Sequence, residues 1–224
     1  MKDSIFSKKI ELKYEKQIKV LILVAVLRHV MSYLFDLTEK ISTYWGTTVA
    51  EVLIYTVIVI PAFVAYKKVG LYREKINFKE VKQYLYGIVL IIPLIISMML
   101  VFGMKISDLA KSEDELTFYD GFDYIWLFLY FVLVVGVTEE FCYRIYIQGE
   151  LQIILGKLSW LAPIISAALF AYMHIVQGTE IQANFTFLVG IVLGYARQYI
   201  KGCTFISIVI AHGLYDFLVV YFVW

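Results

Sequence analysis

Residues 84–104 read YLYGIVLIIPLIISMMLVFGM, and none of them is Asp, Glu, Lys or Arg. A helix needs about 20 mostly apolar residues to cross the hydrocarbon core of a bilayer, and this segment meets that requirement. Six further segments share its length and apolar character, although Arg28 and His29 interrupt the middle of the first. They are residues 18–37, 45–66, 122–143, 158–177, 183–200 and 203–224. The sequence therefore predicts one all-α integral-membrane domain over residues 1–224, a polytopic helical bundle of about seven spans.

The composition of the whole chain also favours a membrane protein. Hydrophobic residues make up 61% of the 224 residues and charged residues 17%, whereas soluble domains average roughly 45–50% and 25%. A chain this apolar and this rich in aromatic residues is neither disordered nor built around one soluble core. Its net charge of +1 provides no reason to expect nucleic acid as a partner.

The distribution of Lys and Arg predicts how the spans are oriented. If the N-terminus lies in the cytoplasm, sixteen of the twenty Lys and Arg residues fall in inner segments and three in outer segments, with Arg28 inside the first span. Cytoplasmic loops of membrane proteins carry such an excess of positive charge. The predicted outer loop, residues 105–124, is acidic instead. We therefore expect a cytoplasmic N-terminus.

Ionisable residues inside the predicted spans gather in three short stretches of the C-terminal half. These stretches are EEFCYR at residues 139–144, FAYMH at residues 170–174 and HGLYD at residues 212–216. Charged side chains are costly in the hydrocarbon core, so their presence there indicates a functional site.

The spacing within two of these stretches predicts specific contacts. Glu140 and Arg144 are four residues apart, as are His212 and Asp216. On a helix this spacing places both members of a pair on one face, so we expect an ion pair in the first case. In the second case we expect a carboxylate that orients an imidazole. Glu139 lies ~100° around the helix from Glu140, which leaves it available for another contact.

The heights of these residues in the bilayer are predicted to match. We expect the fourth and fifth spans to meet at a turn formed by Gly156 and Lys157. Glu139 lies 17 residues before Gly156, and His174 lies 17 residues after Lys157. In an antiparallel hairpin both would be ~25 Å from the turn, at about 1.5 Å per residue. His212, ten residues after a second predicted turn at residues 201–202, is compatible with the same pocket.

A carboxylate that faces an imidazole across a small polar cavity can activate a water molecule by taking its proton. Amide hydrolysis also needs a group that stabilises the tetrahedral oxyanion, and a second histidine can supply it. The same side chains also suit a divalent metal such as zinc. The candidate ligands are Glu139, His174, His212 and Asp216. The sequence contains no HExxH zinc motif and no glycine-rich phosphate loop, and the residues alone leave metal-based and glutamate-based chemistry open.

Taken together, the three stretches resemble the EExxxR, FxxxH and Hxxx(N/D) motifs of the CAAX-protease and bacteriocin-processing (CPBP or Abi) family of intramembrane endopeptidases, in the same order. The resemblance covers roughly residues 122–220. It implies that Glu139 is the water-activating base and that His174 lies beside it. It further implies that Glu140 and Arg144 brace the helix.

The last motif departs from part of that family. Members similar to the eukaryotic enzyme have Asn at its final position, whereas this chain has Asp216. By the resemblance, His212 and Asp216 would bind the oxyanion or complete the site. An ionised Asp cannot donate a hydrogen bond to an oxyanion, whereas Asn can. We therefore expect Asp216 to orient His212 or to bind a metal.

The resemblance implies a peptide or lipidated protein as substrate, the bilayer as surroundings and the cell membrane of a bacterium as location. It does not distinguish a prenylated CAAX tail from a bacteriocin leader or a signalling peptide.

Two other functions would use the same polar cluster: a non-catalytic peptide-binding or bacteriocin-immunity protein, and a small transporter or proton relay. The Glu140–Arg144 pair could also be purely structural. Arg28 and His29, which stand apart, are interpreted as interhelical packing or snorkelling side chains, and a contribution of either to a site is left open.

Overall fold

The computed structural model describes residues 2–41, 44–102, 121–177 and 180–223, and within these ranges the chain is helical and contains no strand. The N-terminal half contains α1 (Lys2–Ser32), a 3-10 segment that extends it (Tyr33–Lys40), α2 (Tyr44–Lys68) and α3 (Val81–Phe102). The C-terminal half contains α4 (Gly121–Leu129), α5 (Val137–Glu140), α6 (Gly149–Leu155), α7 (Ala162–Gln177), α8 (Glu180–Tyr199) and α9 (Phe205–Val223). The predicted all-α fold class is confirmed.

Each predicted span coincides with a helix, but the structure supports only part of the membrane prediction. Within the described ranges, four helical stretches are long and apolar enough to cross a bilayer: Tyr14–Phe35, Trp45–Lys68, Val81–Leu100 and Asp123–Ile175. A shorter apolar helix covers Phe205–Val219. The count of seven crossings and the cytoplasmic N-terminus stay predictions. Most of the predicted acidic loop, residues 103–120 of the chain, lies outside the described residues.

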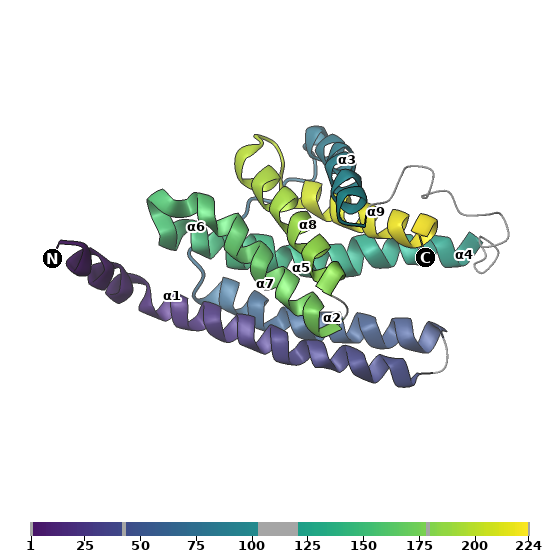
Figure 1. The fold of residues 1–224 in the computed structure, drawn as a ribbon, viewed down its shortest axis with the longest axis horizontal. Coiled ribbons are helices and arrows are strands. Elements are labelled where there is room, and N and C mark those ends of the chain that lie inside the picture. The colour runs from purple at the N-terminus through teal and green to yellow at the C-terminus, as the bar shows by residue number, and fades with distance from the viewer. Residues whose placement is uncertain (1, 42–43, 103–120, 178–179, 224) are drawn as a thin grey trace.

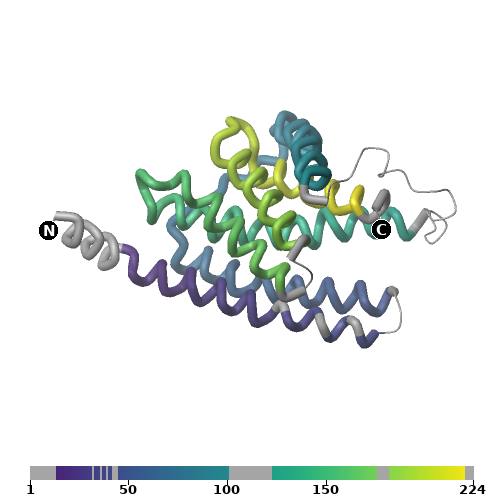
Figure 2. The backbone as a smooth tube through the Cα atoms, viewed as in Figure 1, coloured from purple at the N-terminus to yellow at the C-terminus, as the bar shows by residue number. Residues whose placement is uncertain are grey.

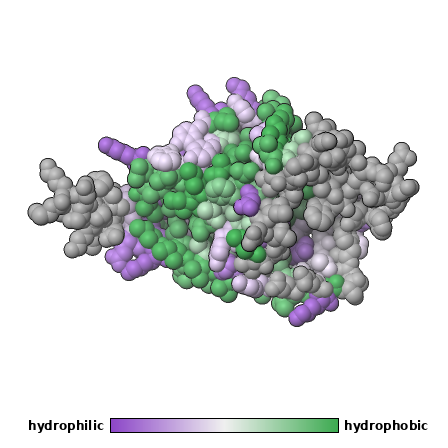
Figure 3. Space-filling model, in the orientation of Figure 1, coloured by the Kyte–Doolittle hydropathy of each residue, from purple (hydrophilic) through white to green (hydrophobic). Residues whose placement is uncertain are grey.

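The helices form a bundle whose outer surface is apolar. Figure 1 shows α1 and α2 side by side along one edge of the bundle. Helix α7 packs against α8, and α3 packs against α9. Figure 2 traces the same path of the backbone. Hydrophobic side chains cover the middle of the described face in Figure 3. Leu53, Ile92 and Leu133 are each more than half exposed. An outward-facing apolar surface of this kind suits lipid rather than water.

One continuous helix at the centre of the bundle carries the first polar motif. Residues 121–155 run through α4, a π-helical segment (Tyr130–Gly136), α5, a second π-helical segment (Phe141–Gln148) and α6. Gly156, with a φ of 55°, ends this helix at the predicted turn. The predicted fourth span ends at residue 143, and the helix continues from there to the turn. Arg144 and Gln148, which lie beyond the predicted span, are both buried, and Gln148 donates to the carbonyl oxygen of Gly194 in α8 at 3.0 Å.

Two glycines allow α9 to approach the central helix closely. A Cβ atom on Gly136 would lie 3.0 Å from the carbonyl oxygen of Val209. A Cβ atom on Gly213 would lie 2.5 Å from the Cα of Val132, a distance that real Cβ atoms do not show. At Gly213 only a residue without a side chain fits, whereas a side chain at Gly136 would require the Val209 carbonyl group to shift slightly. This approach places His212, the neighbour of Gly213, beside α5.

Replacing Gly213 by Ala is therefore expected to lower the free energy of unfolding by about 1–3 kcal/mol, because the new methyl group meets backbone atoms that cannot move aside. Thermal unfolding of the purified protein in detergent measures the effect. Gly194→Ala is the milder comparison, since its methyl group would meet two side-chain atoms, of Gln148 at 2.9 Å and of Pro163 at 3.0 Å, and no backbone atom closer than 3.4 Å. Equal losses of stability in the two variants would contradict the close backbone contact at Gly213.

The loop between α2 and α3, residues 69–80, contacts two of the three helices that carry the polar motifs. Glu150 in α6 accepts hydrogen bonds from the backbone N–H groups of Leu71 and Tyr72, at 2.7 and 2.8 Å. Glu74 accepts one from the N–H of Phe205, the first residue of α9, at 3.3 Å, and pairs with Arg197 of α8 at 3.1 Å. The loop thus links the central helix, α8 and the start of α9.

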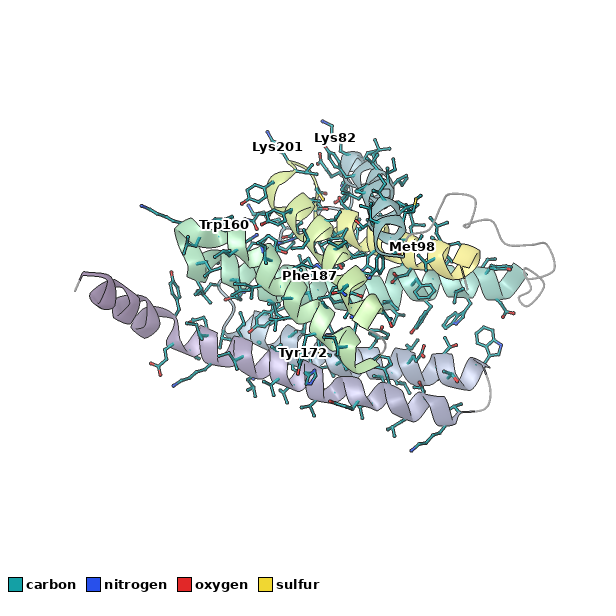
Figure 4. All side chains as sticks on the ribbon, viewed as in Figure 1. Lys82, Met98, Trp160, Tyr172, Phe187 and Lys201 are labelled. Atoms are coloured by element: carbon teal, nitrogen blue, oxygen red, sulfur yellow. The ribbon has the colours of Figure 1, made fainter. Side chains whose placement is uncertain are left out.

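The Tyr72 hydroxyl forms a further contact within this loop. It donates a hydrogen bond to Glu74, and burial raises the pKa of Tyr72 to about 12, so the hydroxyl keeps its proton near neutral pH. At the same end of the bundle, Thr204 donates to Gln83 at 2.7 Å and joins the starts of α3 and α9. Lys82 and Lys201 project outward from this end (Figure 4).

Candidate active site

The site is built around α5, a single helical turn between the two π-helical segments. π-helical segments are rare and often occur at functional sites, because they displace side chains from the regular helical positions. The turn carries Glu139 and Glu140, whose side chains are buried, with exposed fractions of 6% and 0%. Buried carboxylates need charged or hydrogen-bonding partners, and each of the two has its own set.

Glu140 joins two of the predicted motifs. Its Oε1 lies 3.3 Å from Nη1 of Arg144, which confirms the predicted ion pair. The same oxygen lies 2.8 Å from Nδ1 of His212 in α9. Because an ionised carboxylate can only accept, the histidine nitrogen is the donor. Arg144 is fully buried and its guanidinium carbon lies 4.3 Å from the centre of the Phe170 ring, so the second motif also touches this pair.

His212 lies among three carboxylates. Its Nδ1 contacts Glu140, whereas its Nε2 lies 3.3 Å from Oδ2 of Asp216 and 3.8 Å from Oε2 of Glu139. The predicted pairing of His212 with Asp216 is confirmed. The side chain of Asp216 is 25% exposed and is the most accessible of these groups. The prediction that Asp216 orients the imidazole is incomplete, because Glu140 makes the closer contact.

The charges of the cluster balance when His212 is protonated. Three carboxylates, Glu139, Glu140 and Asp216, stand against the guanidinium groups of Arg28 and Arg144. An imidazolium at position 212 supplies the third positive charge. Buried ionic groups are tolerated only when paired in this manner.

His174 lies at the edge of this cluster. Its Nδ1 is 3.0 Å from the carbonyl oxygen of Phe170, which can only accept, so Nδ1 carries the proton and Nε2 is left as an acceptor. The Phe170 ring contacts both imidazoles, with centroid distances of 4.9 Å to His174 and 5.8 Å to His212. In the described part of the chain His174 forms no ion pair or hydrogen bond with Glu139. Its predicted position beside Glu139 therefore stays a prediction.

Two residues of the N-terminal half reach the site: Arg28, for which the sequence leaves a contribution open, and Tyr55, which is not among the predicted site residues. Arg28 of α1, interpreted above as packing or snorkelling, is 5% exposed and its Nη2 lies 3.4 Å from Oε1 of Glu139. The Tyr55 hydroxyl of α2 donates to the same oxygen at 3.4 Å. Snorkelling is wrong for Arg28, and interhelical packing is right. Its central position in an apolar span was the available signal, whereas nothing in the sequence marks Tyr55.

His29, the neighbour of Arg28, faces elsewhere. Its ring stacks on Tyr172 of α7 with centroids 4.7 Å apart, and Tyr172 extends toward α1 in Figure 4. This contact packs α1 against α7. The predicted interhelical packing of His29 is therefore confirmed.

The predicted metal ligands do not form a metal centre in this arrangement. Among the residues that the structure describes, no group of three or more His, Cys, Asp or Glu side chains is placed to hold a metal ion. Both nitrogens of His212 already face carboxylates. Binding of zinc or another divalent metal stays a prediction, which a chelator can test.

Comparison with known proteins supports the motif assignment. Residues 121–218 match the family model described as type II CAAX prenyl endopeptidase Rce1-like, a stretch somewhat shorter than half of the chain. No curated protein and no solved structure matches the chain. The matched stretch contains all three polar motifs, and its limits lie within a few residues of those expected from the motifs. Over residues 121–218, the chain is therefore similar to the Rce1-like family of type II CAAX prenyl endopeptidases.

Proposed function

We propose that the protein is an intramembrane endopeptidase that hydrolyses a peptide bond in a membrane-associated or lipidated peptide. The family match implies a protease. The observation that carries the proposal is the approach of Glu139 to His212. Oε2 of Glu139 lies 3.8 Å from Nε2 of His212, and both side chains are buried. The two atoms are too far apart for a direct hydrogen bond, and one water molecule can contact both.

Glu139 acts as the general base in the proposed reaction. Its Oε2 takes a proton from the water molecule while the water oxygen attacks the carbonyl carbon of the scissile bond. The carbonyl oxygen becomes the oxyanion of a tetrahedral intermediate. When the C–N bond breaks, the proton held by Glu139 passes to the leaving nitrogen. The products are a carboxylic acid, which keeps the second proton of the water, and an amine, and Glu139 is again ionised.

His212 stabilises the oxyanion in this proposal. With Nδ1–H bound to Glu140, Nε2 of the imidazolium lies 3.3 Å from Oδ2 of Asp216 and 3.8 Å from Oε2 of Glu139, and its N–H donates to the oxyanion that forms beside them. Arg144 holds Glu140, and Asp216 supports the positive charge of the imidazole ring. We assign His174, whose Nδ1 is bound to the carbonyl oxygen of Phe170, as a second polar group for the substrate through its Nε2.

We also propose that the chain crosses the cell membrane of a bacterium seven times with its N-terminus in the cytoplasm. The excess of Lys and Arg in the inner segments supports the orientation. The resemblance of the motifs to bacteriocin-processing proteins supports the bacterial location. Fusion of a periplasmic reporter enzyme after each predicted span tests the topology, and activity after the odd-numbered spans is the expected pattern.

The function is tested with purified protein reconstituted in vesicles. A peptide ending in a CAAX tail is added in farnesylated and in unmodified form, and mass spectrometry records the products. We expect cleavage, with a higher kcat/KM for the farnesylated peptide because its lipid places it in the bilayer. Peptide that is bound but never cleaved would indicate the peptide-binding or immunity function, and proton flux without cleavage would indicate a relay.

The same assay addresses the metal. Loss of cleavage with a chelator, restored by zinc, would assign the reaction to a metal-dependent mechanism. An unchanged rate would assign it to protein side chains alone.

A further inference from the structure

The two carboxylate oxygens of Glu139 have different surroundings. Oε1 receives the contacts from the N-terminal half, one from the guanidinium of Arg28 and one from the hydroxyl of Tyr55, both at 3.4 Å. Oε2 faces Nε2 of His212. Donors from two separate helices therefore meet at one oxygen and leave the other directed toward the space where water is activated.

The side chain of Arg28 is itself fixed in place. Its Nε donates to the Tyr143 hydroxyl at 3.1 Å, and its Nη1 lies 3.8 Å from the Cys142 sulfur. Both partners belong to the central helix, immediately after α5. A guanidinium held at three of its nitrogens cannot swing away from Glu139 without losing the other contacts. The position of Arg28 is therefore set independently of Glu139.

Tyr55 is fixed by its ring. The ring packs edge-on against Phe35, with centroids 5.0 Å apart, and against Tyr130, with centroids 6.4 Å apart. Tyr130 is held in turn by a hydrogen bond of 2.7 Å to Glu51, which lies one turn before Tyr55 in α2. The ring cannot rotate freely between these neighbours, so the hydroxyl keeps its direction toward Glu139.

We infer that Arg28 and Tyr55 are positioning residues that hold the catalytic carboxylate with Oε2 toward the water, an inference that rests on the proposed function. Both residues lie outside the stretch that matches the Rce1-like family. Helices α1 and α2 thus complete the active site and do more than anchor the matched domain in the membrane. A carboxylate without these two donors can turn about its terminal bond, and misplacement of a general base slows catalysis without weakening substrate binding.

The first test is kinetic and uses the full-length protein in vesicles. Tyr55→Phe keeps the ring and removes the donor, so we expect kcat to fall about tenfold while KM stays within about twofold. Arg28→Gln is expected to lower kcat further, and Arg28→Lys, which retains the charge, to recover part of that loss. Tyr66→Phe is the matched control on the same helix, because the Tyr66 hydroxyl contacts the N–H of Glu74 and not the site.

The second test needs no turnover. Isotope-edited infrared spectra identify the carboxylate band of Glu139 as the band that disappears in Glu139→Gln. Removal of a hydrogen bond shifts such a band, so we expect a shift in Tyr55→Phe and none in Tyr66→Phe. An Arg28→Gln variant that fails to fold leaves the inference testable through Tyr55→Phe in both measurements.

An unchanged kcat in Tyr55→Phe, or an unshifted Glu139 band, would overturn the inference while leaving the proposed function in place. If kcat falls equally in Tyr55→Phe and in Tyr66→Phe, the role of Tyr55 is only structural. If the wild-type protein cleaves no peptide, the proposed function fails and the catalytic part of the inference fails with it. The infrared band then still decides whether Tyr55 holds the carboxylate.

Discussion

Replacing Glu139 by Gln is expected to lower the rate of peptide cleavage by about a thousandfold, because the amide cannot take a proton from water and general-base catalysis contributes roughly that factor. The substitution keeps the size of the side chain and one carbonyl oxygen that Tyr55 and Arg28 can reach. Substrate binding should therefore change little. Steady-state kinetics with the farnesylated peptide measures kcat and KM separately, and thermal unfolding confirms that the variant is folded.

Glu150→Gln provides the matched control. Glu150 is a buried acid on the same central helix, and its contacts are two backbone N–H groups that a Gln oxygen can also accept. We expect this variant to retain its activity per folded molecule. Comparable cleavage by wild-type protein and Glu139→Gln would remove Glu139 as the base, whatever the behaviour of the control.

Replacing Arg144 by Met is expected to lower the free energy of unfolding by about 3–5 kcal/mol, because it leaves the carboxylate of Glu140 buried without its guanidinium partner. Both side chains have an exposed fraction of 0%. The double variant Glu140→Gln/Arg144→Met removes both charges and should lose less stability than the sum of the two single variants. The double-mutant cycle is completed by measuring the unfolding, in detergent, of the wild-type protein, the two single variants and the double variant.

The chain contains an exposed pair with the same spacing as a control. Glu15 and Lys19 of α1 form an ion pair four residues apart, and both side chains are more than half exposed. Lys19→Met should leave stability nearly unchanged, since exposed pairs contribute little. The buried ion pair would be contradicted if the losses of unfolding free energy in Glu140→Gln and Arg144→Met simply added in the double variant. A loss in Lys19→Met as large as that in Arg144→Met would contradict it as well.

Local spacing was sufficient to predict part of the site. Glu140 with Arg144, and His212 with Asp216, are close in the structure because residues four apart share a helical face. The first pair forms although the backbone becomes π-helical directly after Glu140. The turn at Gly156 follows from a glycine at the end of an apolar segment. These features depend only on residues near one another in the chain.

Contacts between helices could not be predicted in the same manner. The hydrogen bond between Glu140 and His212 joins residues 72 positions apart and depends on the close approach of α9 at Gly213. Arg28 reaches Glu139 across 111 positions, and its sequence neighbourhood shows only a charge in an apolar span. The predicted fourth span ends at residue 143, yet Arg144, Gln148 and Glu150 are also buried, because each finds polar partners inside the bundle. Packing, which the local pattern does not encode, decides these positions.

The most direct measurement is the mass of the products formed from a farnesylated CAAX peptide in isotopically labelled water, with wild-type protein and with Glu139→Gln. If Glu139 and His212 activate a water molecule, the wild-type protein yields two fragments, and the new carboxyl group carries one heavy oxygen atom. The Glu139→Gln protein, folded to the same extent, yields intact peptide. Intact peptide with both proteins, or equally labelled fragments from both, would contradict hydrolysis at this site.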